Sequence, residues 1–353
     1  MTLLDDPRVY DHLDVSGMHN HLRGLPQQCR LAWTEANSLP LPADYSEIDK
    51  IVVLGMGGSA IGGDLARALA SSRSRVTLVS HRDYGIPAFV DDRTLVIASS
   101  YSGTTEETLD GFQRALAVKC KKIAITTGGK LKDLADEHGI PAFVFDYRSP
   151  PRAAVGYSLM PILAVLQKLA VLPDISEEVD SALSSMQAVC SRVDTHVPES
   201  DNVAKNLAAC LCGRLPVIYG AGVLSPVAYR WKTQLNENGK TWAISETMPE
   251  LCHNSVAGLA LPDKLKEKAY VLMLQAPAMH VRYQARYAIV GEVLDKSGIP
   301  HRIVSAEGGS ELGQVLGLVM LGDWTSYYLA ILNGVDPTPI PSIDYLKDRL
   351  SRF

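Results

Sequence analysis

The sequence predicts an α/β protein with two doubly wound parallel-sheet lobes, each an αβα sandwich, preceded by N-terminal helices. Three observations predict this fold. From residue 50 onward short apolar runs alternate with helical patterns, glycine and hydroxyl residues follow several of these runs, and a degenerate copy of the pattern begins near residue 213. Strands that alternate with helices form parallel sheets, because each return to the sheet needs a crossover helix.

The N-terminal half of the chain contains the first lobe. Residues 7–37 carry two helical patterns with His19 and His21 between them, and these two histidines are interpreted as structural because no partner pattern lies nearby. One predicted helix follows the Gly55–Ala60 turn and ends near residue 71, and the others span 104–118 and about 131–138. The predicted strands are 50–54, 76–79, 94–98, 122–126 and 142–145.

The C-terminal half repeats this order after a helical connection. Helical patterns at 159–172, 176–192 and 201–212 link the two lobes. The second lobe has predicted strands at 215–219, 269–274 and 302–304, with helices at 226–238 and 281–297. The sequence therefore divides into an N-terminal helical segment (1–44), a first lobe (45–150), a helical connection (151–212) and a second lobe with a C-terminal tail (213–353).

Composition limits the class of protein. The chain has 353 residues, 46% of them hydrophobic, which is enough for two full cores. A net charge of −5 without a basic stripe argues against nucleic acid as a partner. No apolar run is expected to reach membrane-spanning length, so we expect no membrane span, and we expect no signal peptide at Met1-Thr-Leu-Leu-Asp-Asp. Six scattered cysteines are typical of reduced thiols in a cytoplasmic protein, and no Cys/His cluster predicts a metal site.

The most informative stretch is Ser-Tyr-Ser-Gly-Thr-Thr-Glu-Glu-Thr (100–108), which follows an apolar strand and begins a helix. A helix N-terminus has unpaired N–H groups and the positive end of the dipole, so it binds anions. The alternative is a simple capping box made by Thr104 and Glu107. Capping needs one hydroxyl rather than four, so the cluster favours a phosphate site, with a sugar phosphate as the expected ligand.

The turn after the first strand, Gly55-x-Gly57-x-x-Ala60, fits a relaxed dinucleotide fingerprint. The second strand, however, ends in Ser80-His81-Arg82 rather than in the acidic residue that holds a ribose. Arg82 would suit a 2′-phosphate, so a nicotinamide cofactor is disfavoured but not excluded. The favoured interpretation is that these glycines bring the backbone close to a small ligand, with Ser59 as a hydroxyl donor.

Two polar positions in the second lobe are candidates for acid–base chemistry. Gly239 is a good residue to follow a helix, which places Glu237 in the last turn. There a carboxylate faces the negative end of the helix dipole, which disfavours its charged form. A carboxylate in such a position suits a base that removes a proton from the carbon next to a carbonyl group. The alternative is a solvent-exposed glutamate. His253 stands beside Asn254 in a proline-containing loop, which makes it the better candidate for a proton relay among the nine histidines.

These residues together carry a resemblance. Gly-Met-Gly-Gly-Ser-Ala-Ile-Gly-Gly-Asp (55–64), the 100–108 stretch, Asn-Glu-Asn (236–238), Pro-Glu-Leu-Cys-His-Asn (249–254) and the ending from Gly334 to Lys347 resemble the bifunctional phosphoglucose/phosphomannose isomerases. The resemblance runs from about residue 45 to the C-terminus, and it is the combination that is specific. It implies two sugar isomerase (SIS) lobes, a homodimer, no metal or other cofactor, and isomerisation of glucose 6-phosphate and mannose 6-phosphate with fructose 6-phosphate.

The resemblance also implies roles for single residues. Glu237 would move the proton through a cis-enediol(ate), and Arg152 would stabilise the negative oxygen of that intermediate without donating a proton. His253, reaching in from the other subunit, and Lys347 would open the sugar ring, and Thr338 is a candidate for specificity at C2. The phosphate would be bound by Gly58, Ser59, Ser100, Ser102 and Thr105.

Other classes of protein fit less well. A regulatory SIS protein that only binds a sugar phosphate would keep the hydroxyl cluster but has no need of Glu237, His253 and Lys347, and usually carries a DNA-binding helix-turn-helix. An SIS-type aminotransferase needs a glutaminase portion, which we do not expect here. The N-terminal 40 residues lie outside the motifs and are expected only to pack.

Overall fold

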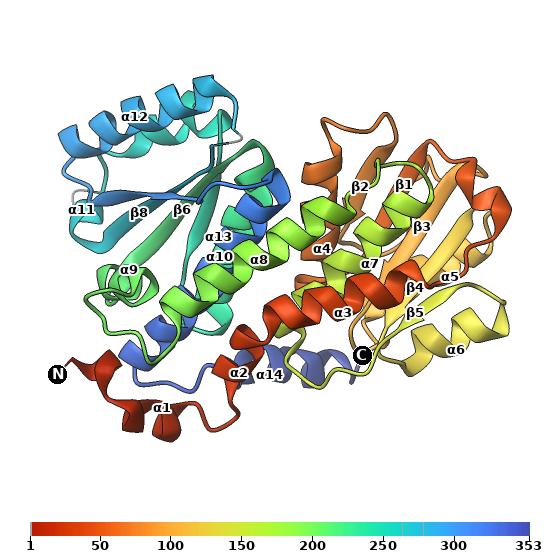
Figure 1. Ribbon diagram of the computed structural model, residues 1–353, viewed down its shortest axis with the longest axis horizontal. Helices are drawn as coiled ribbons and strands as arrows, with labels where there is room; N and C mark the ends of the chain where they lie inside the picture. Colours follow the sequence, from red (N-terminus) through yellow and green to blue (C-terminus); the bar gives the residue numbers. More distant parts are fainter. Residues whose placement is uncertain (1, 263, 278) are drawn as a thin grey trace. The chain divides into compact units, whose positions relative to one another are not determined.

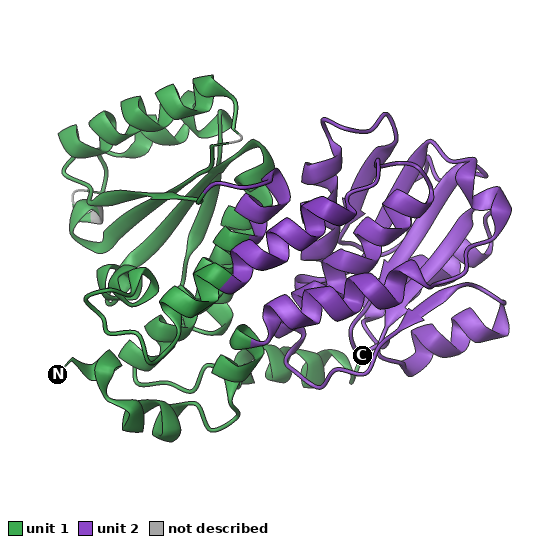
Figure 2. Ribbon diagram, viewed as in Figure 1, with its two compact units in different colours: residues 1–23, 188–307, 317–353 green, residues 24–187, 308–316 purple. Residues whose placement is uncertain are grey.

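The structure, a computed structural model, describes residues 2–262, 264–277 and 279–353. Its contacts divide the chain into two compact units, each built from separate segments of the sequence (Figure 2). Unit 1 comprises Met1–Arg23, Ala188–Glu307 and Gly317–Phe353, and unit 2 comprises Gly24–Gln187 and Gly308–Leu316.

These units divide the chain differently from the predicted segments 1–44, 45–150, 151–212 and 213–353. Residues 24–44 belong to unit 2 because α3 (Leu25–Asn37) packs along α7 (Val155–Lys168). Gln28 fastens the pair, since its Nε2 donates to the Ala153 carbonyl at 2.9 Å and its Oε1 accepts from Gly156 N at 2.7 Å. Residues 1–23 belong instead to unit 1.

Unit 2 contains a parallel five-stranded sheet in the order β2-β1-β3-β4-β5 (Figure 1). The strand order changes direction between β1 and β3, and ligands bind beyond the carboxyl ends of strands at such a point. The doubly wound sheet predicted from the sequence is therefore confirmed. The strands are β1 (Lys50–Leu54), β2 (Thr77–His81), β3 (Thr94–Ser99), β4 (Lys121–Thr126) and β5 (Ala142–Val144).

Helices cover both faces of this sheet. Because side chains alternate along a strand, Val52, Leu54 and Val96 share one face, where they join a core with α5 (Glu106–Leu116) and α6 (Gly129–Glu137). Val53 points the other way, against Gly63 of α4 (Gly57–Ala70). Helix α7 packs on α4, so two layers of helix cover this face of the sheet.

Unit 1 contains a parallel four-stranded sheet in the order β7-β6-β8-β9. Helix α12 (Val281–Lys296) lies on one face and α10 (Ser225–Glu237) on the other (Figure 1). This order matches β2-β1-β3-β4 of unit 2, which confirms the predicted repetition, and β5 has no counterpart. The strands are β6 (Leu215–Ala221), β7 (Ile244–Met248), β8 (Ala269–Gln275) and β9 (His301–Ser305), with the short helix α11 (Leu265–Lys268) before β8.

Strand β7 was not predicted from the sequence, which left its residues unassigned. It pairs with a neighbour on one side only, and four of its five residues are exposed or half-buried. An edge strand of this kind carries neither an apolar run nor a clear alternation.

Three further helices complete the connection and unit 1: α8 (Ser176–Val193), α9 (Val203–Leu211) and α14 (Pro341–Leu350). Of the four boundaries between the units, two fall within α8 and α13 (Glu311–Leu332), and the other two follow Arg23 and Glu307. Helix α13 is apolar on all sides, so it lacks the amphipathic period that marks a surface helix.

The expectation that no apolar run reaches membrane-spanning length was wrong. By length and composition α13 is sufficient to cross a membrane, but 89% of its most apolar window is buried within the protein. Burial of that extent is typical of the core helix of a globular domain, and α13 is such a helix.

The N-terminal segment contains α1 (Pro7–Leu13) and α2 (Met18–Arg23). His19 and His21 lie within α2 rather than between two helices, because three helices, not two, occupy residues 7–37. His19 Nδ1 is 2.7 Å from the Asp14 carboxylate, and burial lowers the pKa of His21. Both observations agree with a structural interpretation of these histidines.

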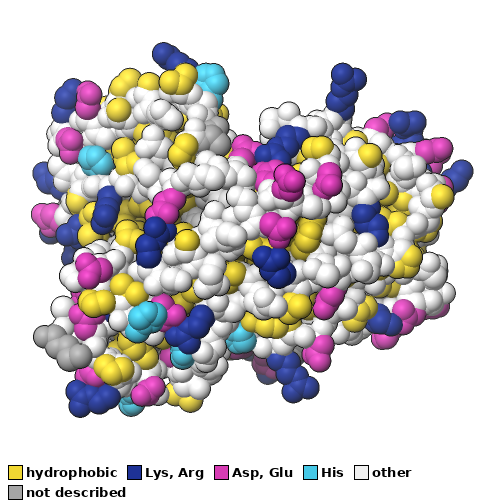
Figure 3. Space-filling model, in the orientation of Figure 1, with side chains coloured by type: hydrophobic (Ala, Val, Ile, Leu, Met, Phe, Trp, Pro, Cys, Tyr) yellow, Lys and Arg dark blue, Asp and Glu magenta, His cyan; other side chains and the backbone are white. Residues whose placement is uncertain are grey.

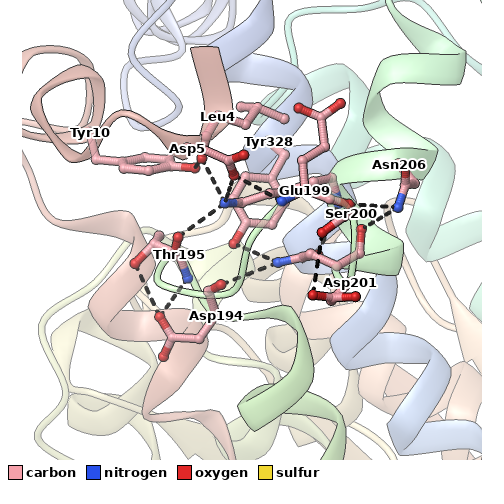
Figure 4. A network of polar contacts seen from close by, with 12 residues as sticks. Leu4, Asp5, Tyr10, Asp194, Thr195, Glu199, Ser200, Asp201, Asn206 and Tyr328 are labelled. Atoms are coloured by element: carbon pink, nitrogen blue, oxygen red, sulfur yellow. Dashed lines mark hydrogen bonds and ion pairs between the residues drawn. The ribbon is translucent and has the colours of Figure 1, made fainter. Parts of the chain in front are cut away.

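The start of the chain is fastened to unit 1 by a buried lysine, Lys205 of α9 (Figure 4). Its ammonium group donates to the Leu4 carbonyl at 2.6 Å and to the Thr195 carbonyl and Asp5 Oδ1 at 3.1 Å. Tyr10 adds a second hydrogen bond to Leu4 O at 2.6 Å. A buried ammonium is tolerated only where several acceptors surround it, so these residues of the N-terminus are part of the core of unit 1.

On the face that Figure 3 shows, Lys and Arg side chains are interspersed with Asp and Glu side chains. Neither sign dominates there, as expected of a chain with a net charge of −5.

Candidate functional site

The hydroxyl cluster predicted from the sequence lies at the carboxyl edge of the unit 2 sheet. Ser59 is on the first turn of α4, directly after β1, while Ser100, Ser102 and Thr105 lie between β3 and α5. We call these four residues the hydroxyl cradle. They adjoin the point where the strand order changes, which is where the sequence placed them.

The capping-box alternative is wrong. The N-cap of α5 is Thr105, not Thr104, and the Thr105 side chain makes no capping hydrogen bond. Its hydroxyl lies 2.9 Å from the Ser100 hydroxyl instead. The side chain at this N-cap therefore leaves the first-turn N–H groups of α5 to other acceptors.

Hydrogen bonds join the two turns of the cradle. Tyr101 N donates to Ser59 Oγ at 3.1 Å, which ties the β3–α5 turn to the start of α4. Ser102 Oγ accepts from Thr104 N at 3.2 Å and from Thr104 Oγ1 at 2.9 Å. Because these serine oxygens act as acceptors, their own O–H groups remain available as donors. Donors held in this way suit an anion with several oxygens.

Two glycines set how closely the backbones approach here. Gly103 has φ +65°, and a β-carbon on it would collide with the Gly128 carbonyl. A β-carbon on Gly58 would lie 2.7 Å from the Pro151 carbonyl oxygen and 3.1 Å from the Arg152 Cα. Gly58 thus brings the start of α4 against the 3-10 helix Pro151–Ala153, and Arg152 beside the cradle. The Arg152 side chain is buried, with 3% of its surface exposed.

A small hollow lies next to the cradle and is lined in part by Gly58 and Ser59. Tyr101 lines it, and the Tyr101 hydroxyl accepts from Ser149 N at 2.9 Å and donates to the Tyr147 carbonyl. Tyr101 therefore holds the loop that leads to Arg152. The sequence pattern gives no signal for this role of Tyr101, because nothing in it distinguishes this tyrosine from the hydroxyl residues around it.

In unit 1, Glu237 is the last residue of α10, in the last turn as the sequence predicted, and its side chain is half-buried. The helix end differs from the prediction in one respect. The left-handed residue is Lys240, with φ +50°, rather than Gly239. Gly239 is required for a different reason, since a β-carbon there would lie 2.8 Å from Leu235 O and 3.2 Å from Leu329 Cδ2.

A buried polar ladder holds α10 against α13. Arg230 Nη2 donates to Asp323 Oδ2 at 2.6 Å, and Gln234 Nε2 donates to Asp323 Oδ1 at 3.0 Å. One turn further, Asn238 Nδ2 donates to Ser326 Oγ at 3.0 Å. Burial raises the pKa of Asp323, against the opposing effect of Arg230. Such buried polar pairs fix the register of two packed elements rather than add stability. Here they fix the register of α10, the helix that ends at Glu237, against α13.

Thr338 lies in unit 1 near the end of α10. Its backbone N–H donates to Asp336 Oδ1 at 2.8 Å. The Lys240 ammonium donates to the Pro337 carbonyl at 3.0 Å and also to the Glu237 carbonyl. Glu237 and Thr338 are thus brought together through one lysine.

His253 and Lys347 lie elsewhere on unit 1. His253 is exposed in the 3-10 helix Glu250–His253, and Lys347 is exposed in α14. Within residues 2–262, 264–277 and 279–353 neither side chain forms a hydrogen bond or ion pair. Asn254, next to His253, donates to Glu250 Oε1 at 2.9 Å and accepts from the Ser255 hydroxyl at 2.9 Å. The role of His253 as a proton relay stays a prediction.

Arg82 is the residue because of which a nicotinamide cofactor was not excluded from the sequence. In the structure it forms an ion pair with Asp64 of α4. Its guanidinium is therefore engaged at the end of β2 and already neutralised by a carboxylate. Among the described residues no three His, Cys, Asp or Glu side chains are grouped so as to hold a metal ion.

Comparison with known proteins identifies relatives along most of the chain. Residues 200–350 match the bacterial phospho-glucose isomerase C-terminal SIS domain. A bifunctional phosphoglucose/phosphomannose isomerase of Caldicellulosiruptor bescii is 37% identical over 95% of this chain and 99% of its own length. The enzyme of the same name from Aquifex aeolicus is 34% identical over 88% and 92%.

A solved structure shares the fold. The crystal structure of a glucose-6-phosphate isomerase like protein from Thermus thermophilus superimposes with a TM-score of 0.62 at 20% identity, covering 99% of both chains. The two parallel sheets, the matching strand orders and these relatives lead to one conclusion. The chain belongs to the bifunctional phosphoglucose/phosphomannose isomerase family, with two SIS lobes.

Proposed function

We propose that this protein interconverts glucose 6-phosphate and mannose 6-phosphate with fructose 6-phosphate, without a metal ion. The observation that carries the proposal is the hydroxyl cradle. Its side chains surround the start of α5 but do not cap it. Membership of the isomerase family supports the reaction class.

The substrate phosphate is held by hydroxyl and backbone groups in this proposal. Ser59, Ser100, Ser102 and Thr105 donate their O–H groups, and Gly58 lets the start of α4 come close. The positive end of the α5 dipole adds attraction for the dianion. Binding of this kind is equal in the ground state and the transition state, so it sets affinity rather than rate.

Glu237 is the proposed base. In the open-chain aldose its carboxylate takes the proton from C2 while the C1 carbonyl oxygen becomes negative, which forms a cis-enediol(ate). A proton passes from the C2 hydroxyl to the C1 oxygen, and the proton held by Glu237 then returns to C1 as the C2 oxygen becomes the ketone. Arg152 is proposed to stabilise the negative oxygen, because a guanidinium keeps its charge and cannot act as the acid.

His253 and Lys347 are proposed to open the sugar ring. Both are exposed in the single chain. We propose that the protein is a homodimer in which His253 serves the active site of the other subunit. Thr338 is the proposed contact near C2, where glucose and mannose differ. The six free cysteines support a cytoplasmic location.

A direct assay tests the proposal. Fructose 6-phosphate is supplied to the purified protein, and glucose 6-phosphate and mannose 6-phosphate are measured separately with coupled dehydrogenases, with and without EDTA. Formation of both products, unaffected by EDTA, is the expected result. Tight binding of the sugar phosphate with no turnover would favour the alternative, a regulatory SIS protein. Loss of activity in EDTA with rescue by zinc would indicate a metal-dependent mechanism.

A further inference from the structure

Lys240 has two properties that a surface lysine beside a helix end does not need. Its φ of +50° places it in the left-handed region, which costs energy for any residue with a β-carbon. Its ammonium group bonds two carbonyls far apart in sequence, those of Glu237 and Pro337. The preceding residue, Gly239, would adopt the left-handed conformation without strain, yet the strained position is occupied by the lysine.

The surrounding structure holds this conformation in place. Asn333, after the end of α13, donates to Gly239 O at 2.8 Å and to Thr241 Oγ1 at 2.9 Å. Thr241 N donates in turn to Leu235 O at 3.1 Å, which closes the end of α10. Lys240 is therefore fixed from both sides, and strain that a structure maintains in this way is typical of functional sites.

We infer that Lys240 is a positioning residue that couples the proposed base to the segment that sets sugar specificity. The last carbonyls of a helix have no partner within it, so a helix end is free to fray unless a side chain binds them. Lys240 binds the carbonyl of Glu237 and, with the same ammonium group, the carbonyl of Pro337, the residue before Thr338. A shift in one segment is thereby transmitted to the other. This inference rests on the proposed function and extends it to a residue in neither the cradle nor the proton-transfer step.

Three substitutions of Lys240 distinguish the effect of its ammonium group from the effect of its strained backbone conformation. K240M removes the charge and keeps a long side chain. K240G removes the charge and also relieves the left-handed strain, so it is expected to fold at least as well as the wild type. K240R keeps a cation with donors enough for both carbonyls. K296M, at an exposed lysine in the last turn of α12, is the matched control.

Each variant is assayed with glucose 6-phosphate and mannose 6-phosphate separately. We expect K240M and K240G to lower kcat roughly tenfold with little change in KM, because a misplaced base costs rate rather than affinity. We also expect the ratio of kcat/KM for the two sugars to change about twofold or more, as for residues that share partners. K240R should restore both quantities, and K296M should leave them unchanged.

Hydrogen exchange gives a readout that does not depend on activity. In K240M and K240G the backbone amides of residues 238–241 and those of Asp336 and Thr338 should exchange faster together, and not in K240R or K296M. If the wild type proves to have no isomerase activity, the proposed function fails while this measurement still judges the coupling. Unchanged exchange in K240G, or an unchanged sugar ratio in an active enzyme, would overturn the inference.

Discussion

Hydroxyl groups at the start of α5 have more hydrogen-bonding capacity than the fold uses. Ser100 and Thr105 share one hydrogen bond, so at least one of their two protons is available to a ligand. Ser102 accepts twice from Thr104 and keeps its own proton as well. The cradle is therefore better suited to donate to oxygen atoms than to stabilise the turn itself.

Replacing Thr105 by valine should mainly raise KM for the sugar phosphate. The variant keeps the shape of the side chain and removes a hydroxyl that would bind the charged phosphate equally in ground and transition states. The loss is worth on the order of 1.5–3 kcal/mol. Steady-state kinetics measure the effect. Thr108→Val in α5 is the matched control, since the Thr108 hydroxyl has no hydrogen-bond partner among the described residues. A KM unchanged in Thr105→Val would place the phosphate elsewhere.

Replacing Glu237 by glutamine should abolish isomerisation and leave sugar-phosphate affinity nearly unchanged. The amide keeps the size of the side chain but cannot take up the proton, and the base acts only in the transition state. Stopped assays give kcat and titration calorimetry gives Kd, with Glu292→Gln on the exposed side of α12 as control. A variant that kept more than about a tenth of kcat, a loss below roughly 1.4 kcal/mol, would remove Glu237 from the role of base.

Single residues mark the limit of what sequence patterns reveal. The positions of the cradle and of Glu237 were predicted because both adjoin recognisable helix ends. The roles of Gly239 and Lys240 were not predicted. Contacts with Leu329 and Asn333, about 90 residues away, determine which of these two neighbours adopts the left-handed conformation. Asp323 and Arg230 were missed for the same reason, because a buried ion pair between two helices leaves no local signal.

At the scale of elements, the close contact of α4 and α7 depends on Gly62. A β-carbon there would overlap the Ser158 hydroxyl and carbonyl, and Ser158 Oγ itself donates to Ser59 O at 2.8 Å. The two helices can therefore approach only with glycine at this position. Ser59 of the cradle is held by the same contact.

Gly62→Ala should destabilise the protein by about 1–3 kcal/mol, because the added methyl group forces the helices apart. Gly317→Ala in α13 provides the matched helical control. Its β-carbon would meet nothing closer than Val189 Cγ2 at 3.7 Å, so it should stabilise the helix by up to about 1 kcal/mol. Thermal unfolding measures both variants, and equal melting temperatures for the two would contradict the packing argument.

The join between α2 and the end of α8 depends on a charge pair. Arg23 donates to the Asp194 carboxylate at 2.7 and 2.8 Å. Burial raises the pKa of Asp194, but the hydrogen bonds and charge of Arg23, with hydrogen bonds from Thr195, lower it to about 2. Because this is below the ordinary value of 3.8, the pair stabilises the fold above about pH 4 and stops doing so as the carboxylate takes up a proton.

Wild-type stability should therefore fall by about 2 kcal/mol from this group between about pH 4 and pH 2. Asp194→Asn should lose that contribution at pH 7 and lack this component of the acid dependence. Urea unfolding at a series of pH values measures the difference, with Asp11→Asn at an exposed position of α1 as control. Parallel stability curves for Asp194→Asn and wild type would show that Arg23 does not stabilise the ionised form.

Most elements were predicted because they are periodic or strongly apolar, and the exceptions have physical causes. Strand β7 is polar and lies at a sheet edge, and α13 is apolar all round. Helix α2 has only six residues, too few for two full turns of pattern. The parallel doubly wound sheets followed from the alternation of strands and helices, whereas the strand orders were not predicted from the sequence.

For the whole molecule, the proposed homodimer predicts complementation between mutants. Glu237→Gln and His253→Ala should each be nearly inactive alone. If His253 serves the neighbouring subunit, a mixed dimer holds one doubly mutated site and one intact site, so activity returns. Exposure of His253, without a hydrogen-bond partner in the described part of the chain, is what a residue acting across a subunit boundary requires.

The two homodimers are mixed under conditions that exchange subunits, and activity is compared with hybrid content measured by native mass spectrometry. A mixture of Glu237→Gln with Glu237→Gln/His253→Ala is the control, since no pairing of those chains yields an intact site. Hybrids that form in full but stay inactive would mean that each chain builds its own site.

The hydrogen bonds from Lys205 to Leu4 and Asp5 also affect the order in which the protein folds during synthesis. The N-terminal residues leave the ribosome first, but the lysine that binds them follows 200 residues after Asp5. At bacterial rates this interval lasts roughly 10–40 s. Unit 2 lies almost entirely within that interval, so its chain is complete but for one short segment while Leu4 and Asp5 still lack their partner Lys205. The N-terminal segment of a nascent chain can therefore take its final place only after Lys205 has been synthesised.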